Sequence, residues 1–193
     1  MDRLSRRWLP VFTRSARAQR GHVRLGMSVV PCAIGKGGIR ARKREGDGAT
    51  PLGVHRVLYA YVRRDQRPTL ATKLPLKTIR RADGWCDAPA DRNYNRAVRH
   101  PYPASAEQMW RADRLYDLVL VLDANIKPRR RGLGSAIFAH VARDGFKPTE
   151  GCIAFRWRDL LRVVRYLRPG DAFVAGSIQH KRKPRSSLRT TGS

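Results

Sequence analysis

The stretch that decides the fold is residues 134–155, which reads GSAIFAHVARDGFKPTEGCIAF. Its first part, residues 136–140, is a short apolar run, and alternation along a strand places Phe138 and His140 on one face. A loop of charged residues, Gly and Pro follows and leads to Gly151 and Cys152. This loop is long enough to fold the chain back. We therefore expect the imidazole and the thiol to meet.

A thiol beside an imidazole is a candidate nucleophile. A free thiol has a pKa of about 8.5, so a nearby histidine is needed to take its proton at neutral pH. The resulting thiolate suits acyl transfer, in which the carbonyl oxygen becomes an oxyanion that needs preorganised donors. Gly151 permits backbone conformations that other residues resist, so the N–H groups of Gly151 and Cys152 are the predicted donors. On spacing alone, a structural Cys/His pair remains the alternative.

The stretch resembles the active-site segment of the L,D-transpeptidase catalytic-domain (YkuD-like) family. That family has a histidine at a strand end and then a Ser/Thr-x-Gly-Cys-Ile/Val segment, which Thr149, Gly151, Cys152 and Ile153 match. A second stretch, KREGDGATPLG at residues 43–53, resembles the family's Lys-x-Gly-Asp-x-x-Thr-Pro-x-Gly segment. Two motifs in the right order are more specific than either alone. The resemblance covers most of the chain.

Three positions depart from the family pattern. Val141 follows the histidine, where the family often has glycine. Ala154 stands where an arginine is common, and Glu150 stands where a basic residue or histidine is frequent. The chain therefore resembles a divergent branch of the family. Arg156 is the candidate to supply the missing positive charge.

The resemblance implies a fold and an activity. The implied fold is mainly β with packed helices, an α+β class with a β-sandwich-like L,D-transpeptidase catalytic domain. The implied activity is a cysteine-dependent L,D-transpeptidase that forms a thioester with peptidoglycan stem peptides and makes L,D (3→3) cross-links. Cys152 is then the nucleophile and His140 the base. Neither a metal nor an organic cofactor is implied, and carbapenems inhibit many family members by acylating the cysteine.

Two other functions stay open. One is an L,D-carboxypeptidase or another peptidoglycan hydrolase of the same fold. The other is a basic binding module with an inactive site. The candidate substrate-binding residues lie beside the motifs or in the long irregular section that begins at residue 83: Thr149, Glu150, Ser135, Arg156, Trp85 and Tyr94. The two aromatic residues either line a cleft or pack this section onto the core.

The 193 residues predict one catalytic domain at 21–179, between a basic arm at 1–20 and a basic disordered tail at 180–193. No run approaches the roughly 20 apolar residues that span a bilayer. The apolar patch near the start is short and is broken by Pro10, so it is not a clear signal peptide. The family implies a periplasmic or cell-envelope location, while the missing signal leaves a cytoplasmic one open.

Charge is the outlier of the composition. There are 41 Lys+Arg against 15 Asp+Glu, a net charge of +26, which favours anionic partners. Peptidoglycan stem peptides are the expected substrate and anionic envelope polymers a candidate partner, whereas nucleic acid is not the partner we expect. A solvated, arginine-rich surface is the alternative. The oligomeric state is not indicated.

Periodicity predicts the main elements. Strands are expected within residues 22–43, over 54–62, over a buried central run at 115–122, and over 171–178. Helices are expected over 105–114, from a capping-box pattern that begins at Ser105, and over 157–168. Cys32 and Cys86 are expected to be buried free thiols rather than a disulfide. No Cys-x-x-Cys pattern suggests zinc.

Overall fold

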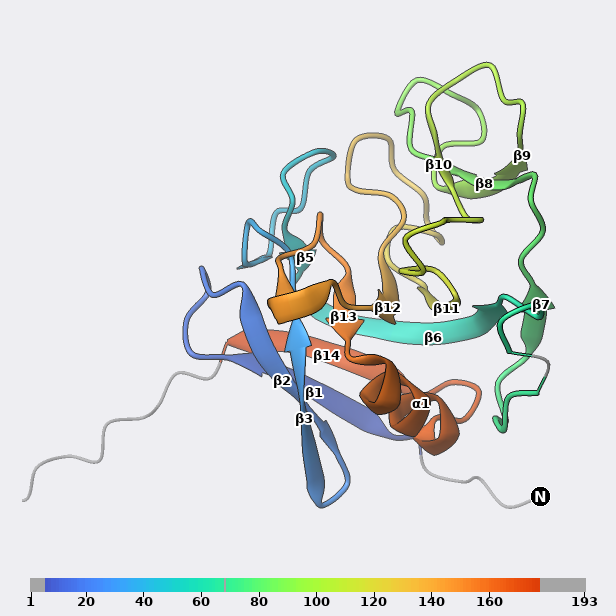
Figure 1. Cartoon of the computed structure of the whole chain (residues 1–193). Coiled ribbons are helices and arrows are strands. Elements are labelled where there is room, and N and C mark those ends of the chain that lie inside the picture. Colours follow the sequence, from blue (N-terminus) through green and yellow to red (C-terminus); the bar gives the residue numbers. More distant parts are fainter. Residues whose placement is uncertain (1–5, 68, 178–193) are drawn as a thin grey trace, which may run out of the picture.

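The computed structural model describes residues 6–67 and 69–177, which are mainly β (Figure 1). Their elements are β1 (Trp8–Thr13), β2 (Arg20–Leu25), β3 (Ser28–Ala33), β4 (Ile39–Arg40), β5 (Thr50–Pro51), β6 (Gly53–Val62), β7 (Leu76–Thr78), β8 (Asp83–Cys86), β9 (Arg96–Arg99), β10 (Ala106–Gln108), β11 (Leu118–Leu122), β12 (Phe138–Val141), the 3-10 turn η1 (Asp144–Phe146), β13 (Ile153–Phe155), α1 (Trp157–Tyr166) and β14 (Ala172–Ser177).

The main sheet closes on itself. Its strand order is β11-β12-β13-β3-β2-β1-β14-β6-β7, and β11 also pairs with β6. The pairs β1–β14 and β12–β13 are parallel. Closure removes the free edges that an open sheet presents. The sheet is therefore barrel-like, which corrects the expected β-sandwich.

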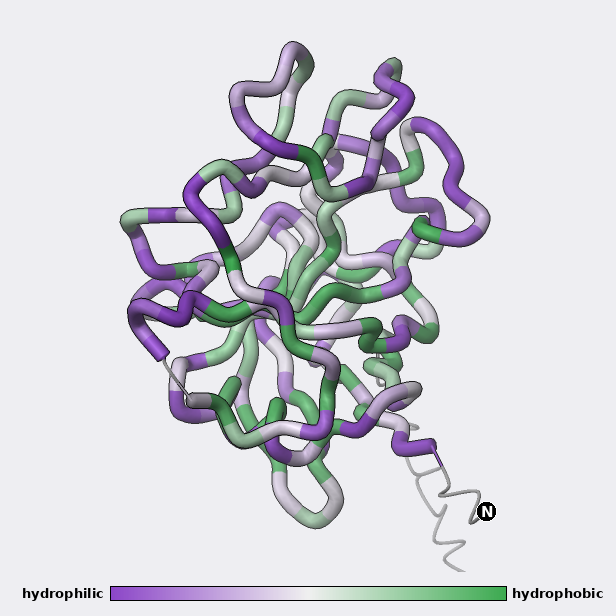
Figure 2. Tube along the Cα trace, turned by 90° about the vertical axis from the view of Figure 1, so that its right-hand side faces the viewer, coloured by the Kyte–Doolittle hydropathy of each residue, from purple (hydrophilic) through white to green (hydrophobic). Residues whose placement is uncertain are grey.

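The central strand β11, LVLVL, is buried along its whole length because both of its faces are covered. Its three leucines pack into one apolar cluster with residues of β1, β3, β14 and α1. Its two valines pack on the opposite face into a second cluster, which also contains Trp85, Phe138 and Cys152. Figure 2 shows apolar segments gathered within the sheet and polar segments on the loops. The candidate thiol thus belongs to the second cluster.

One of the two predicted helices is present in the described part of the chain. Residues 157–168 contain α1, whose apolar face packs Leu160, Val163 and Val164 onto the first cluster. The helix predicted over 105–114 is wrong, because Ala106–Gln108 is instead strand β10 and pairs with β8. Cross-strand pairing therefore overrides the capping pattern. Of the helices expected to pack on the sheet, only α1 is present in the described residues.

The expected N-terminal arm is also corrected. Trp8–Thr13 is strand β1, which pairs with β14 and β2, and Leu9 and Val11 are buried. Alternating burial explains why this short apolar run, which lies between arginines, joins the sheet. The tail expected at 180–193 lies outside the described residues. Cys32 and Cys86 are free and buried, as predicted.

A small sheet, in the order β10-β8-β9, lies to one side of the barrel (Figure 1). Its Trp85 packs edge-on against Phe138 of β12, with ring centroids 5.1 Å apart. The small sheet therefore covers the barrel face that carries Cys152. None of the helices in the described residues is long and apolar enough to cross a membrane.

Candidate active site

Strands β12 and β13 position the thiol and the imidazole. The two strands are parallel, with His140 opposite Ala154. Side chains two residues apart on a strand share a face, so Cys152 projects from the same face as His140. Both residues line one pocket of about 320 Å³. The loop between them folds back as expected, while in the described residues no hydrogen bond joins the thiol to the imidazole.

The Cys152 thiol is buried and held by two backbone groups. Its S–H donates to the Ala136 carbonyl oxygen at 3.2 Å, and its sulfur accepts from the Phe138 N–H at 3.4 Å. Ala136 has φ +51°, a strained conformation for alanine that helps to set the direction of this carbonyl. Burial, followed by the negative charge of Glu107, raises the pKa of Cys152 to about 12. The resting thiol is therefore protonated.

The His140 ring is fixed in one orientation. Its Nδ1 lies 2.8 Å from the Val141 carbonyl oxygen, so Nδ1 carries the proton and Nε2 is left as an acceptor. The Tyr116 ring packs against it edge-on, with centroids 5.2 Å apart. Burial lowers the pKa of His140 to about 4. The resting imidazole is therefore neutral and able to accept a proton.

Thr149 organises the backbone before the thiol. Its Oγ1 donates to the Cys152 carbonyl oxygen at 2.7 Å and accepts from the Gly151 N–H at 3.2 Å. Among the described residues, none accepts a hydrogen bond from the Cys152 N–H. Of the two predicted oxyanion donors, the Cys152 N–H is thus unengaged and the Gly151 N–H is shared with a hydroxyl.

Gly151 is required by its surroundings. Its φ is +133°, which L side chains rarely adopt, and a Cβ there would lie 2.7 Å from the Ala49 carbonyl oxygen. Ala49 belongs to the second motif, residues 43–53. The two motifs that the sequence singled out therefore meet in space at Gly151.

Asp47 holds the second motif in shape. It pairs with Lys43 at 2.5 Å and accepts from the N–H groups of Arg44 and Ala49 at 2.8 and 2.9 Å. Burial alone would raise the pKa of this carboxyl, but the hydrogen bonds from Lys43 and the backbone lower it. This network fixes Ala49, and hence the surface against which Gly151 packs.

The structure brings together only some of the predicted substrate-binding residues. Ser135, Thr149 and Glu150 line the pocket with Cys152 and His140. The Ser135 hydroxyl donates to Glu45 at 2.8 Å. Glu150 is exposed and pairs with Lys36 at 2.8 Å.

Trp85, Tyr94 and Arg156 do not line this pocket. Trp85 and Tyr94 are buried, and the Tyr94 hydroxyl donates to Glu45. The Arg156 guanidinium lies over the Phe146 ring, 5.0 Å from its centroid. The cleft-lining interpretation of these aromatic residues is thus replaced by the packing alternative, and Arg156 supports a loop instead of facing the thiol.

Sequence reasoning missed Glu107 and Tyr116, which both line the pocket. The Tyr116 hydroxyl donates to Glu107 at 2.6 Å. Burial raises the pKa of Glu107 and raises that of Tyr116 well above its usual value. The local pattern around Glu107 predicts a helix. Only its pairing with β8 turns it toward the thiol.

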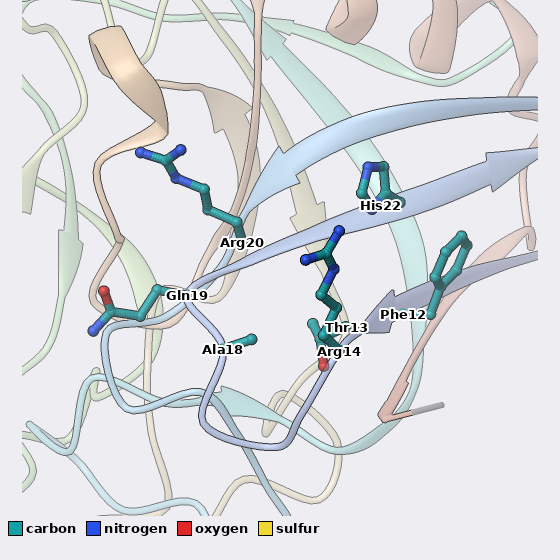
Figure 3. Close-up of a pocket in the computed structure, with 7 residues that line it drawn as sticks. All are labelled: Phe12, Thr13, Arg14, Ala18, Gln19, Arg20 and His22. Carbon is teal, nitrogen blue, oxygen red and sulfur yellow. The ribbon is translucent and has the colours of Figure 1, made fainter. Parts of the chain in front are cut away.

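A larger hollow, of about 1180 Å³, lies elsewhere along β1 and β2 (Figure 3). Its lining residues are Phe12, Thr13, Arg14, Ala18, Gln19, Arg20 and His22. None of them carries a thiol, and none of them lines the Cys152 pocket. Figure 3 shows the Arg20 side chain reaching toward the Asp144–Phe146 turn, and its Nη2 donates to the Gly145 carbonyl oxygen at 2.6 Å. This contact ties β2 to the loop above the Cys152 pocket.

A buried thiol, a neutral imidazole on the same face and an unengaged backbone N–H suit acyl transfer through sulfur. No three His, Cys, Asp or Glu side chains cluster to hold a metal ion in the part of the chain that the structure describes. The family model for the L,D-transpeptidase catalytic domain (YkuD) matches residues 12–175, most of the chain. The protein belongs to this family, whose substrate is peptidoglycan. Comparison with curated proteins gave no match.

Proposed function

We propose that the protein is a cysteine-dependent L,D-transpeptidase that cross-links peptidoglycan stem peptides through a thioester on Cys152. The observation that carries this proposal is the position of Cys152 and His140 on one face of adjacent strands, lining one pocket. The expected site is the cell envelope, where this substrate lies. Anionic envelope polymers are the further partners that the charge of +26 favours.

The first half-reaction starts from neutral groups. Nε2 of His140 removes the S–H proton as the sulfur attacks the carbonyl carbon that follows the L-centre of the stem's third residue. The S–C bond forms, and the carbonyl oxygen becomes an oxyanion that accepts a hydrogen bond from the Cys152 N–H. The C–N bond to the terminal D-residue then breaks. Its nitrogen takes the proton from His140, and the acyl group stays on sulfur.

The second half-reaction releases the product. An amine of a neighbouring stem attacks the thioester, His140 removes its extra proton, and the C–S bond breaks. The sulfur takes the proton back and the new amide is the L,D (3→3) cross-link. Attack by water would instead release a tripeptide, which is the carboxypeptidase alternative. Ping-pong kinetics are expected in both cases.

The test is product analysis by mass spectrometry, with a tetrapeptide stem as donor and a second stem as the amine acceptor. We expect a dimer that has lost one terminal D-residue, and no such product from Cys152→Ala. Tripeptide alone, even with acceptor present, would assign the protein to the carboxypeptidases. An unreactive protein that binds DNA in a salt-sensitive way would contradict the proposal and favour a basic binding module.

A further inference from the structure

We propose that Arg143 and Lys147 form a carboxylate-binding site that selects acyl donors ending in a free carboxylate directly after the scissile bond. This inference rests on the proposed function and names the feature of the donor that the site recognises. Both residues line the pocket of Cys152 and His140 and are exposed to solvent. They stand on either side of the Asp144–Phe146 turn.

The positive charges of the pocket are not equivalent. Arg111 also lines it, but its Nε and Nη2 are held by the two carboxylate oxygens of Asp113, at 2.8 and 2.5 Å. Arg143 and Lys147 form no ion pair and no side-chain hydrogen bond within the described part of the chain. They are therefore the two cations of the pocket whose donors are available to a ligand.

The loop that carries these cations is tied down at several points. The Ala142 N–H donates to Phe155 at 2.7 Å and the Thr149 N–H donates to Ile34 at 3.0 Å. The Gly145 carbonyl accepts from Arg20. Arg156, the residue before α1, also packs its guanidinium over the ring of Phe146, so the loop is held from several strands and from the start of the helix. A braced loop loses less conformational freedom when its side chains bind a ligand.

None of the acidic residues that line the pocket forms an ion pair with Arg143 or Lys147 among the described residues. Glu107 accepts from Tyr116, Glu45 accepts from Ser135, and Glu150 pairs with Lys36. The remaining acid, Asp87, follows β8 and forms no ion pair with either cation in the described part of the chain. Asp144 lies in the turn itself, and the pKa of Asp113 is lowered first by its hydrogen bond from Arg111 and further by the charge of Arg143. Since neither carboxylate forms an ion pair with Arg143 or Lys147 in the described residues, the side-chain donors of these two cations are left for an anion.

The charge of Arg143 also affects the pKa of the base, His140. After burial, the positive charges of Arg111 and Arg143 contribute to the lowered pKa of His140. In the proposed reaction, His140 delivers its proton to the nitrogen of the leaving D-residue. The carboxylate of that residue is two bonds from this nitrogen, so it lies in the same part of the pocket. A guanidinium binds a carboxylate with two parallel hydrogen bonds, which also fixes its position.

The test compares two acyl donors that differ only at the end, a tetrapeptide with a free terminal carboxylate and its terminal carboxamide. Acylation of Cys152 is followed by intact-protein mass spectrometry. For wild type, kcat/KM of acylation should be about tenfold or more higher with the free acid than with the carboxamide. This ratio is the one expected from a single charged hydrogen bond. Arg143→Gln and Lys147→Gln should each reduce the ratio of kcat/KM for the free acid to kcat/KM for the carboxamide, mainly by raising KM for the free acid.

The matched control is Arg158→Gln, which removes the same charge from an exposed position on α1 outside the pocket. It should keep the wild-type preference. The inference is overturned if wild type acylates equally with both peptides, or if the Arg143→Gln/Lys147→Gln double variant keeps the full preference. In either case the proposed function stands, because the thioester still forms. Failure of both peptides to acylate wild type would instead overturn the proposed function and, with it, this inference.

Discussion

Cys152 and His140 rest uncharged because burial disfavours the charged form of each side chain. The thiol pKa is raised to about 12 and the imidazole pKa is lowered to about 4, so proton transfer has to accompany attack on the substrate. The S–H group first has to leave the Ala136 carbonyl. Substrate binding is thus part of the activation of this nucleophile.

The neutral pair predicts how Cys152 reacts with iodoacetamide. Because only thiolate reacts, the alkylation rate should rise about tenfold per pH unit from about pH 7 to about pH 9. The measurement is mass spectrometry of the peptide that contains Cys152, with Cys152→Ala as the control. A rate plateau near neutral pH would show a preformed thiolate–imidazolium pair and contradict this account.

The lowered pKa of His140 predicts that the folded protein loses stability in mild acid. Its pKa falls from an unfolded value near 6.5 to about 4 in the folded protein, so the unfolded state binds the proton first. Stability is therefore present above about pH 6.5 and is lost as the pH falls toward about 4, by about 3 kcal/mol in total.

The measurement is urea unfolding of wild type and His140→Gln across this pH range. The variant should lose less stability than wild type. Some pH dependence should remain, because burial also lowers the pKa of His55. Parallel curves for the two proteins would show that His140 is not buried in its neutral form.

At the residue scale, local sequence was sufficient to predict the candidate pair and its immediate neighbours. Cys152, His140, Ser135 and Thr149 lie in one continuous stretch whose alternation and turn residues are readable. Glu107, Tyr116 and the cations of the pocket were not assigned a role at the thiol. Their positions depend on pairing between segments far apart in the chain, which no local pattern reports.

At the scale of elements, the two motifs act as one unit because Gly151 packs on the backbone of Ala49. Gly151→Ala should destabilise the protein by about 2–4 kcal/mol, since it combines a strained φ with a close contact to a backbone oxygen. It should also reduce acylation, because it displaces the Cys152 N–H.

The matched control is Gly176→Ala in β14, where a Cβ meets no atom within 4 Å. Thermal unfolding and acylation rates of both variants provide the measurement. Equal stability of the two variants would mean that the contact between the motifs does not constrain the site.

Most elements follow from sequence periodicity. The run at residues 118–122 is a strand buried on both faces, and α1 has the expected helical spacing. The prediction failed at 105–114, where a capping pattern competes with pairing to β8. It also failed at 8–13, where the flanking arginines and Pro10 obscured an alternation that buries Leu9 and Val11.

At the scale of the whole molecule, closure of the barrel was beyond sequence reasoning. It needs β1 to lie parallel to β14 and β11 to lie beside β6, and both pairings join segments far apart in the chain. Strand periodicity gives the faces of a strand but not its neighbours. The class, mainly β, was predictable, whereas the barrel-like arrangement was not.

The charge of +26 predicts a dependence of stability on salt. Like charges on a compact protein repel, and salt screens them. Raising NaCl from about 0.01 M to about 0.15 M should raise Tm by about 3 °C, which corresponds to ~1 kcal/mol. Differential scanning calorimetry is the measurement. A fall in Tm would show that attractive ion pairs outweigh the net repulsion.

The central claim is that Cys152 carries the acyl group and that His140 makes this possible. The most direct measurement is intact-protein mass spectrometry with peptide mapping, after brief incubation with a tetrapeptide stem and an acid quench. The account predicts a thioester-bound tripeptide on Cys152, its absence in Cys152→Ala, and acylation slowed about 100-fold or more in His140→Gln. An unmodified protein, or an adduct on Cys32 or Cys86 that survives Cys152→Ala, would contradict it.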